Sequence, residues 1–166
     1  MKATLFSLFL ATALTSCTWF ESLKPKETFY CKVNGEKFRP DKDNSPIGGI
    51  GSDPLRVQFD KENGWLSILV RKLPNSMTLI IKVAPNETLK LDDFLFTNDV
   101  KLSKAYYNLN YAEQNAEALI SQSGTFKITK IDGYNLSGTF EFTCKSAKTG
   151  KEYKITDGQF NDISYY

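Results

Sequence analysis

The chain has 166 residues, with 21 Lys and Arg against 19 Asp and Glu, so its formal net charge is only +2. This near balance, without basic clusters, gives no electrostatic basis for binding nucleic acid. The absence of histidine removes His-dependent catalytic triads, the usual zinc sites and the commonest general base. Since no glycine-rich phosphate loop, GxSxG elbow or HExxH motif is present either, we expect a protein that is not an enzyme and uses no cofactor.

The chain begins with Met1-Lys2 and an apolar segment from Ala3 to Leu14, followed by small residues and Cys17. This is the layout of a secretory signal peptide, which has a basic residue, an apolar run and small residues at its cleavage site. A helix of this length rises only about 18 Å, too short to cross a hydrocarbon core of about 30 Å. We therefore expect residues 1–16 to be a signal peptide rather than a transmembrane or buried helix.

The segment Leu14-Thr15-Ser16-Cys17 resembles the lipobox of bacterial lipoproteins, with an aliphatic residue, two small residues and the cysteine. The resemblance implies cleavage before Cys17, diacylglycerol on its sulfur and a further acyl chain, such as palmitate, on the new amino group. Several acyl chains anchor firmly, because each buried methylene contributes about 0.8 kcal/mol. The alternative is an ordinary secretory cut nearby. We expect a membrane partner through lipid on Cys17, within the bacterial cell envelope.

Residues 17–28 contain a proline and mixed charges with little periodicity, which indicates a lipidated tether. A single β-domain over residues 29–166 follows. Its first segment, "FYCKVNGEKFRP", predicts two strands around Asn34-Gly35, the strongest short hairpin signal. After a loop rich in Gly, Pro and Asp (41–54), strands are expected over 55–60, 65–72 and 77–83, separated by the turns "KENG" and "LPNS".

The middle of the chain has weaker patterns. Residues 88–96 and 104–111 each fit a strand, and "AEQNAEA" fits a loop or one helical turn. Clear alternation returns over 123–132, 134–146 and 151–166, with turns at Asp132-Gly133 and "AKTG". About ten short antiparallel strands joined by tight turns predict an all-β meander. A lipocalin-like barrel and a two-sheet sandwich both remain open.

A near-repeat joins two of these strands, "SGTFKIT" at 123–129 and "SGTFEFT" at 137–143. In the second copy, alternation places Leu136, Phe140 and Phe142 toward the interior, with Gly138 in the same phase. Glycine inside a strand often marks a bend or a close approach of two backbones. We expect a larger residue at Gly138 to clash.

Three segments, "KVNGEKFRP", "SGTFKITKIDGYNLSGTFEFTC" and "YKITDGQFNDISY", resemble a group of Bacteroidota lipoproteins described only as a domain of unknown function. Its members share a VNG hairpin after the lipid cysteine, a paired SGT(F/L) segment and a terminal strand. The resemblance implies the all-β fold and the envelope location, and supplies no catalytic residue. Surface-exported lipoproteins of Bacteroidota tend to carry an acidic cluster after the cysteine. Here only Glu21 follows, which favours the periplasmic face of the outer membrane over surface exposure.

With Cys17 assigned to lipid, Cys31 and Cys144 remain as an even pair in an oxidising compartment. Alternation places Cys31 on the face of Phe29 and Val33, and Cys144 on the face of Phe140 and Phe142. Both sulfurs are therefore expected to point inward. We favour a disulfide between them, and two reduced cysteines acting as small hydrophobes are the alternative.

Other candidate sites give weaker signals. Asp92 with Asp93, or Asp157 with Asp162, would serve a carboxylate-based hydrolase, although adjacent strand residues point to opposite faces. Asp41, Asp43 and Ser45 have the spacing of a calcium loop, but Pro46 and Ser52 stand where that loop needs glycine and glutamate, so a solvated turn is favoured and no metal site is predicted.

The tyrosine-rich segment "KAYYNLNY" offers a candidate ligand surface. Tyr107, Asn108 and Asn110 would stack on and hydrogen-bond to a glycan or peptide if one face of the strand is exposed. The alternative is that Tyr107 is an ordinary half-buried strand residue.

Three function classes follow. The favoured class is a non-enzymatic binding or accessory lipoprotein, whose partner would be an apolar ligand, a glycan or another envelope protein. The second is a structural or interaction module of an envelope complex without a small-molecule pocket, and the third is a hydrolase. A closed barrel with an apolar cavity would favour the first, a filled core with an exposed strand edge the second, and a cleft with two facing carboxylates the third.

Overall fold

The computed structural model of the protein describes residues 27–42, 53–113 and 116–166; the predicted signal peptide, Cys17 and most of the tether lie outside these ranges. The described residues form ten β-strands and no helix. The strands are β1 (Phe29–Val33), β2 (Glu36–Phe38), β3 (Leu55–Asp60), β4 (Trp65–Lys72), β5 (Asn75–Lys82), β6 (Asp93–Phe96), β7 (Lys104–Leu109), β8 (Glu117–Asp132), β9 (Asn135–Lys145) and β10 (Glu152–Ser164).

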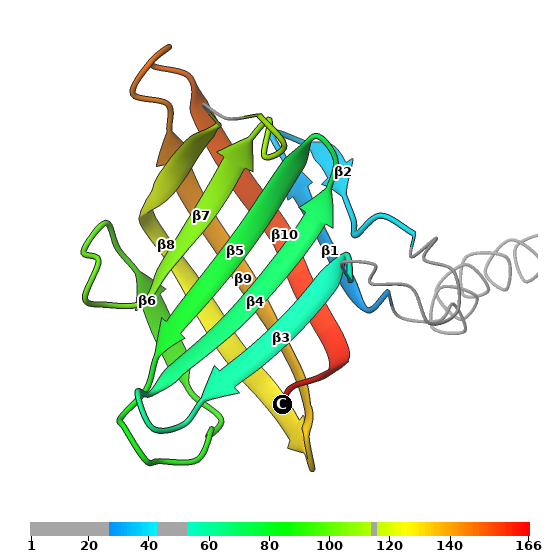
Figure 1. The fold of residues 1–166 in the computed structure, drawn as a ribbon, viewed down its shortest axis with the longest axis vertical. Coiled ribbons are helices and arrows are strands. Elements are labelled where there is room, and N and C mark those ends of the chain that lie inside the picture. Colours follow the sequence, from blue (N-terminus) through cyan, green and yellow to red (C-terminus); the bar gives the residue numbers. More distant parts are fainter. Residues whose placement is uncertain (1–26, 43–52, 114–115) are drawn as a thin grey trace, which may run out of the picture.

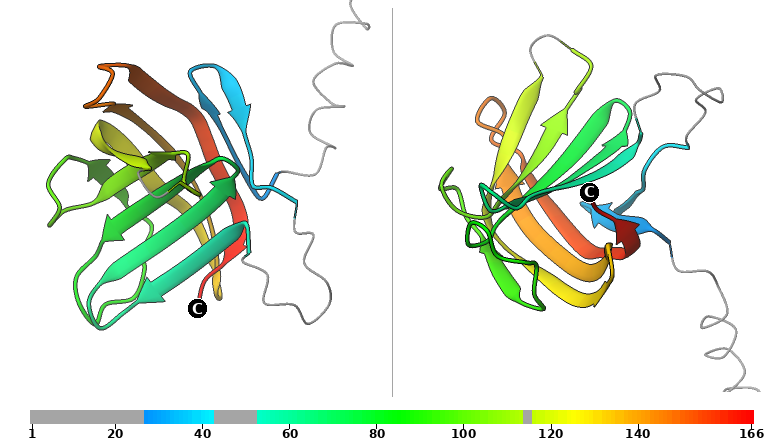
Figure 2. Two further views of the ribbon diagram at one scale, coloured as in Figure 1. Left: turned by 45° about the horizontal axis from the view of Figure 1, so that its top comes forward. Right: turned by 60° about the horizontal axis from the view of Figure 1, so that its bottom comes forward.

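All ten strands belong to one antiparallel sheet that curls into a half-barrel, so the all-β prediction is confirmed (Figure 1). In hydrogen-bonding order the strands run β2-β1-β10-β9-β8-β7-β5-β4-β3, and β6 pairs with β8 off this path. Figure 2 shows β3, β4 and β5 facing β9 and β10 across the interior. The backbone N–H of Phe59 on β3 donates to the carbonyl of Tyr166, 3.0 Å away, which links this edge of the sheet to the C-terminal residues.

The curl is concentrated in the three long strands β8, β9 and β10, whose pairing is interrupted by register shifts. In β10 these shifts fall between Ile155 and Gly158 and between Phe160 and Ile163. Asp157 lies within the first shift and has a φ of 54°. An extra residue in one strand bends that strand and increases its twist, so these irregularities give the sheet its curvature.

The tight turns follow local sequence chemistry. Asn34 and Gly35 have φ of 50° and 85°, which is the type I′ geometry that an Asn-Gly hairpin favours, so that prediction is confirmed. The β8–β9 turn consists of Gly133 and Tyr134, because Asp132 pairs with Asn135. It therefore lies one residue later than the sequence predicts.

The middle of the chain forms two strands that share one neighbour. β6 pairs with the second half of β8 and β7 with its first half. The intervening loop is closed by a hydrogen bond of 3.1 Å from the N–H of Thr97 to the carbonyl of Ser103. Both weakly predicted segments thus contain strands, and the loop between them projects from the side of the half-barrel (Figure 1).

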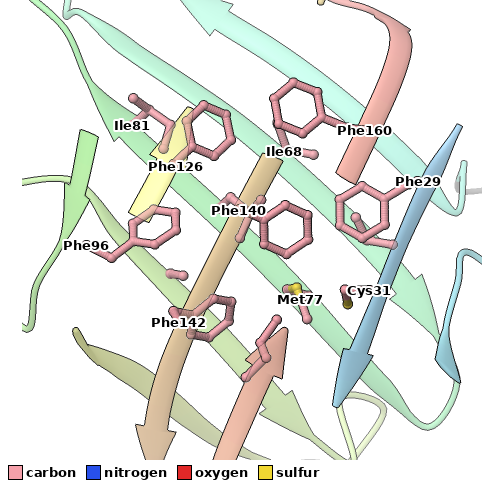
Figure 3. Packing of buried hydrophobic residues seen from close by; sticks show 14 of the residues in the cluster. Phe29, Cys31, Ile68, Met77, Ile81, Phe96, Phe126, Phe140, Phe142 and Phe160 are labelled. Atoms are coloured by element: carbon pink, nitrogen blue, oxygen red, sulfur yellow. The ribbon is translucent and has the colours of Figure 1, made fainter. Parts of the chain in front are cut away.

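The core lies inside the curl and combines aromatic rings with aliphatic side chains (Figure 3). Phe126 and Phe160 stack with centroids 5.1 Å apart, and Phe29 stacks on Phe140 at the same distance. Such rings bury large apolar areas and hold defined geometries. The part of the interior between β1, β8, β9 and β10 is therefore a packed core.

Two glycines make this packing possible, because each lies opposite a phenylalanine on the neighbouring strand. Gly138 pairs with Phe160, and Gly158 pairs with Phe140. A Cβ on Gly138 would lie 2.0 Å from the carbonyl oxygen of Lys127 and 2.4 Å from Cζ of Phe160. The predicted clash at Gly138 is confirmed, since real Cβ atoms do not approach other atoms so closely.

Candidate functional site

The best candidate for a binding site is a pocket of about 320 Å³ at the upper end of the half-barrel in Figure 1. It lies where the β1–β2 turn, the β4–β5 turn, β7 and the start of β10 meet; we call it the mouth pocket. Its lining residues are Val33, Asn34, Glu36, Lys37, Phe38, Lys72, Leu73, Pro74, Asn75, Tyr107, Lys151 and Tyr153. Ligand pockets measure about 300–1,000 Å³, so this one suits a single ring with its substituents.

Hydrogen bonds hold two walls of the mouth pocket in place. Asn34 fixes the β1–β2 turn to β10: its Oδ1 accepts from the N–H of Lys154 at 2.7 Å, and its Nδ2 donates to the carbonyl of Glu152 at 3.3 Å. Nζ of Lys72 donates to the carbonyl of Lys37 at 2.6 Å and so joins the β4–β5 turn to β2. A site whose walls are fixed in advance loses less entropy when a ligand binds.

The floor of the mouth pocket is aromatic. The ring centroid of Tyr107 lies 5.5 Å from that of Tyr153 and 6.1 Å from that of Phe38. Tyr107 is only 4% exposed; its burial, helped by the nearby Tyr153, raises its pKa to about 12. The phenol is therefore neutral at physiological pH, and its hydroxyl forms no hydrogen bond with any residue that the structure describes.

The walls of the mouth pocket carry excess positive charge. The lining residues include Lys37, Lys72 and Lys151 and one carboxylate residue, Glu36. Nζ of Lys72 lies 5.7 Å from the ring centroid of Phe38, and Nζ of Lys151 lies 5.0 Å from that of Tyr153. Across residues 27–42, 53–113 and 116–166, these three lysines form no salt bridge. By contrast, salt bridges to carboxylates are formed by Lys32, Lys90, Lys127, Lys130 and Lys154.

The structure separates the three residues that the sequence grouped as a ligand surface. Tyr107 points inward and lines the mouth pocket, whereas Asn108 lies on the opposite face of β7, where its Nδ2 donates to Oγ of Ser76 at 2.9 Å. Asn110 follows the strand, and its N–H donates to Oδ1 of Asn75 at 3.3 Å. Only Tyr107 therefore belongs to the candidate site.

Figure 3 shows Cys31 among the core side chains. Cys31 and Cys144 are fully buried, as alternation predicts, but both are free thiols, so the favoured disulfide is not formed. The reason is topological, because β10 lies between β1 and β9. Two strand spacings amount to about 9.6 Å, beyond the Cα separation of about 7 Å that a disulfide tolerates. Burial raises the pKa of each thiol to about 12, which leaves them as small core hydrophobes.

The carboxylates considered for catalysis are exposed and engaged with basic side chains or turns. Asp92 accepts the N–H of Asp93 at 2.8 Å. The other three carboxylates form salt bridges: Asp93 with Lys127 at 3.0 Å, Asp157 with Lys32 at 2.8 Å, and Asp162 with Lys130 at 3.8 Å. Each of these carboxylates is therefore held at the surface by a neighbouring side chain or turn.

The calcium-like segment is only partly described. Asp43 and Ser45 lie outside the described residues, and Oδ2 of Asp41 accepts the N–H of Leu73 at 2.8 Å. Within the described ranges, no group of three or more His, Cys, Asp or Glu side chains is arranged to hold a metal ion.

A second surface feature is an exposed apolar patch around β6. It comprises Leu91, Leu95, Val100 and Leu102, of which Leu95 is 71% exposed. Among the described strands, β6 pairs only with β8. Exposed apolar side chains beside a free strand edge are typical of surfaces that contact other proteins.

Comparison with models of known protein families, with curated proteins and with solved structures finds no match. The described residues contain no helix of the length and hydropathy needed to cross a membrane.

Proposed function

We propose that this protein is a non-enzymatic envelope lipoprotein, anchored through Cys17, that binds a small ligand in the mouth pocket. The observation that carries the proposal is the lining of that pocket. An aromatic floor and the unpaired hydroxyl of Tyr107 border a space of about 320 Å³, whose lining holds three lysines against the one carboxylate of Glu36. Nζ of Lys72 and Nζ of Lys151 lie over the rings of that floor. A few convergent polar groups around an aromatic surface are characteristic of small-ligand sites.

The side chains that are present support binding rather than catalysis. The chain has no histidine, and burial suppresses ionisation of Cys31 and Cys144. The carboxylates considered for catalysis are exposed and engaged elsewhere, and the pocket itself is lined by ammonium groups, phenols, rings and the single carboxylate of Glu36. These groups orient and hold a ligand without providing a nucleophile–base pair.

The position of the mouth pocket also fits a lipid anchor before β1. The described chain enters β1 from Glu27, and β1 runs toward its last residue, Val33, which lines the pocket. Five residues of strand span about 17 Å. Glu27 and the pocket therefore lie at opposite ends of β1, so the described chain enters the domain at the end away from the pocket.

Ligand-observed NMR with a library of small polar and aromatic fragments tests this proposal. Fragments should bind the wild-type mature protein and bind more weakly to Tyr107→Phe, which removes one hydroxyl. Tyr134→Phe is the matched control, because Tyr134 is exposed in the β8–β9 turn. An absence of binding fragments, or equal binding to the wild type and Tyr107→Phe, would count against a ligand site at the mouth pocket.

The apolar patch around β6 supports a second candidate, an interaction module of an envelope complex. The stacked phenylalanines fill the interior between β1 and β9, which favours an interaction module over a protein that stores an apolar ligand there. A photo-crosslinking residue at Leu95 should capture a specific envelope protein in cells. The same residue at Tyr134 serves as a control on another exposed surface, and capture from both positions alike would contradict a specific role for the patch.

A further inference from the structure

The geometry points to the class of ligand: a carboxylate attached to a single ring, either a sugar acid or an aromatic acid. This inference rests on the proposed function and specifies the ligand of the same pocket. It combines two independent observations, the uncompensated charge of the walls and the aromatic floor.

The lining favours an anion, because three lysines outnumber the single carboxylate of Glu36 and form no salt bridge within the described residues. Nζ of Lys72, at the end of β4, lies over the ring of Phe38, and Nζ of Lys151, just before β10, lies over the ring of Tyr153. Lys37 lines the space from β2. Lys72 uses one of its three donors on the carbonyl of Lys37. A carboxylate has two oxygens with about four acceptor positions and would take up the unused donors, whereas a neutral ligand would leave the charge uncompensated.

The floor requires a ring. Tyr153 and Tyr107 lie in contact at 5.5 Å between centroids, and Phe38 adjoins Tyr107. Aromatic faces bind flat apolar surfaces, which aromatic rings and the C–H faces of sugars both present. The hydroxyl of Tyr107 adds a neutral donor or acceptor for a ligand oxygen. Inorganic phosphate would meet the ammonium groups but would leave the aromatic floor uncovered.

Isothermal titration of the mature protein with matched probes tests the inference. Galacturonate and benzoate carry a carboxylate on a ring, galactose and benzyl alcohol are their neutral counterparts, and inorganic phosphate is an anion without a ring. Each carboxylate should bind at least about tenfold more tightly than its counterpart, as expected for hydrogen bonds to charged groups. The tighter binder of galacturonate and benzoate then shows whether the pocket prefers a sugar acid or an aromatic acid.

Variants locate the effect in the mouth pocket. Lys151→Gln should weaken carboxylate binding about tenfold and leave binding of the neutral probes unchanged. Lys127→Gln is the matched control, since it removes the same charge from β8, where Lys127 pairs with Asp93. Lys72→Gln provides a second test on another wall. Because these lysines are solvent-accessible, raising the salt concentration should also weaken binding.

The possible failures are distinguishable. If neutral probes bind as tightly as carboxylates, the anion inference is wrong while the proposed ligand site stands. If phosphate binds as tightly as the ring carboxylates, the requirement for a ring is wrong. Equal losses in Lys151→Gln and Lys127→Gln would place binding outside the mouth pocket. If no probe binds, the ligand class is wrong, and the fragment screen with Tyr107→Phe decides separately whether the pocket binds ligands.

Discussion

Replacement of Gly138 by alanine should destabilise the protein more than the same change at Gly150, in the turn between β9 and β10. The new Cβ would lie 2.0 Å from the carbonyl oxygen of Lys127 on β8 and 2.4 Å from Cζ of Phe160 on β10. Neither neighbour moves easily, because the first is backbone in a paired strand. The second belongs to a ring stacked on Phe126 at 5.1 Å.

The magnitude follows from two opposing effects. Overpacking a well-filled core costs about 1–3 kcal/mol, and a contact with backbone falls at the upper end. Replacing glycine by alanine also restricts the unfolded chain, which returns about 0.4–1 kcal/mol. We therefore expect Gly138→Ala to lower the free energy of unfolding by about 2 kcal/mol. In a domain of this size that lowers the Tm by about 4–8 °C.

Urea denaturation followed by tryptophan fluorescence, to which Trp65 on β4 contributes, measures this loss. Gly150→Ala is the control, because a Cβ at Gly150 has no atom within 4 Å and meets only the strain of a φ of 72°. That strain costs about 1 kcal/mol. If Gly138→Ala were no less stable than Gly150→Ala, the close packing of Phe160 on Gly138 would be refuted as the reason for this glycine.

Three further predictions concern the cysteines and Tyr107. Cys31 and Cys144 should not react with a thiol reagent at pH 8 in the folded mature protein, and both should react in denaturant; absence of reaction there would reveal a disulfide. In the folded protein the pKa of each of these two thiols is about 12, against 9.0 when unfolded. The pKa of Tyr107 is likewise about 12, against 10.0 when unfolded. Between about pH 9 and 12 the unfolded state binds fewer protons, so stability should fall as pH rises, by up to about 4 kcal/mol per thiol; urea midpoints that do not change up to pH 11 would contradict this. Cys17→Ser should abolish labelling by a palmitate analogue and release the protein from the membrane fraction, whereas persistent labelling would exclude Cys17 as the lipid site.

The fold was predictable where local chemistry decides it. Asn34-Gly35 selects its turn through its own backbone preferences, and the period-two alternation around Phe140 reflects burial of one strand face. The middle of the chain was less predictable, because β6 has only four residues and is a strand only through its pairing with β8. That pairing joins Asp93 to Lys127 across a large separation in sequence.

The candidate site was predictable only in part. Alternation correctly places Cys31 and Cys144 inward, but the order of strands in the sheet decides whether they can meet. Tyr107 was identified on composition, whereas Lys72 and Lys151 carry no sequence signal, because each is an ordinary charged residue beside a turn. Their importance arises only when the sheet curls and brings three turns together.

The carboxylates that suggested catalysis instead help to explain that curl. Asp157 and Asp162 have φ of 54° and 53° at the two irregularities of β10, a conformation that aspartate tolerates better than most residues. Each irregularity bends β10. Its start thereby reaches the mouth pocket through Tyr153, while the residues beyond its end reach β3 through the bond from Phe59 to Tyr166. In this protein, the residues that resemble an acid–base pair shape the strand on which the proposed ligand site depends.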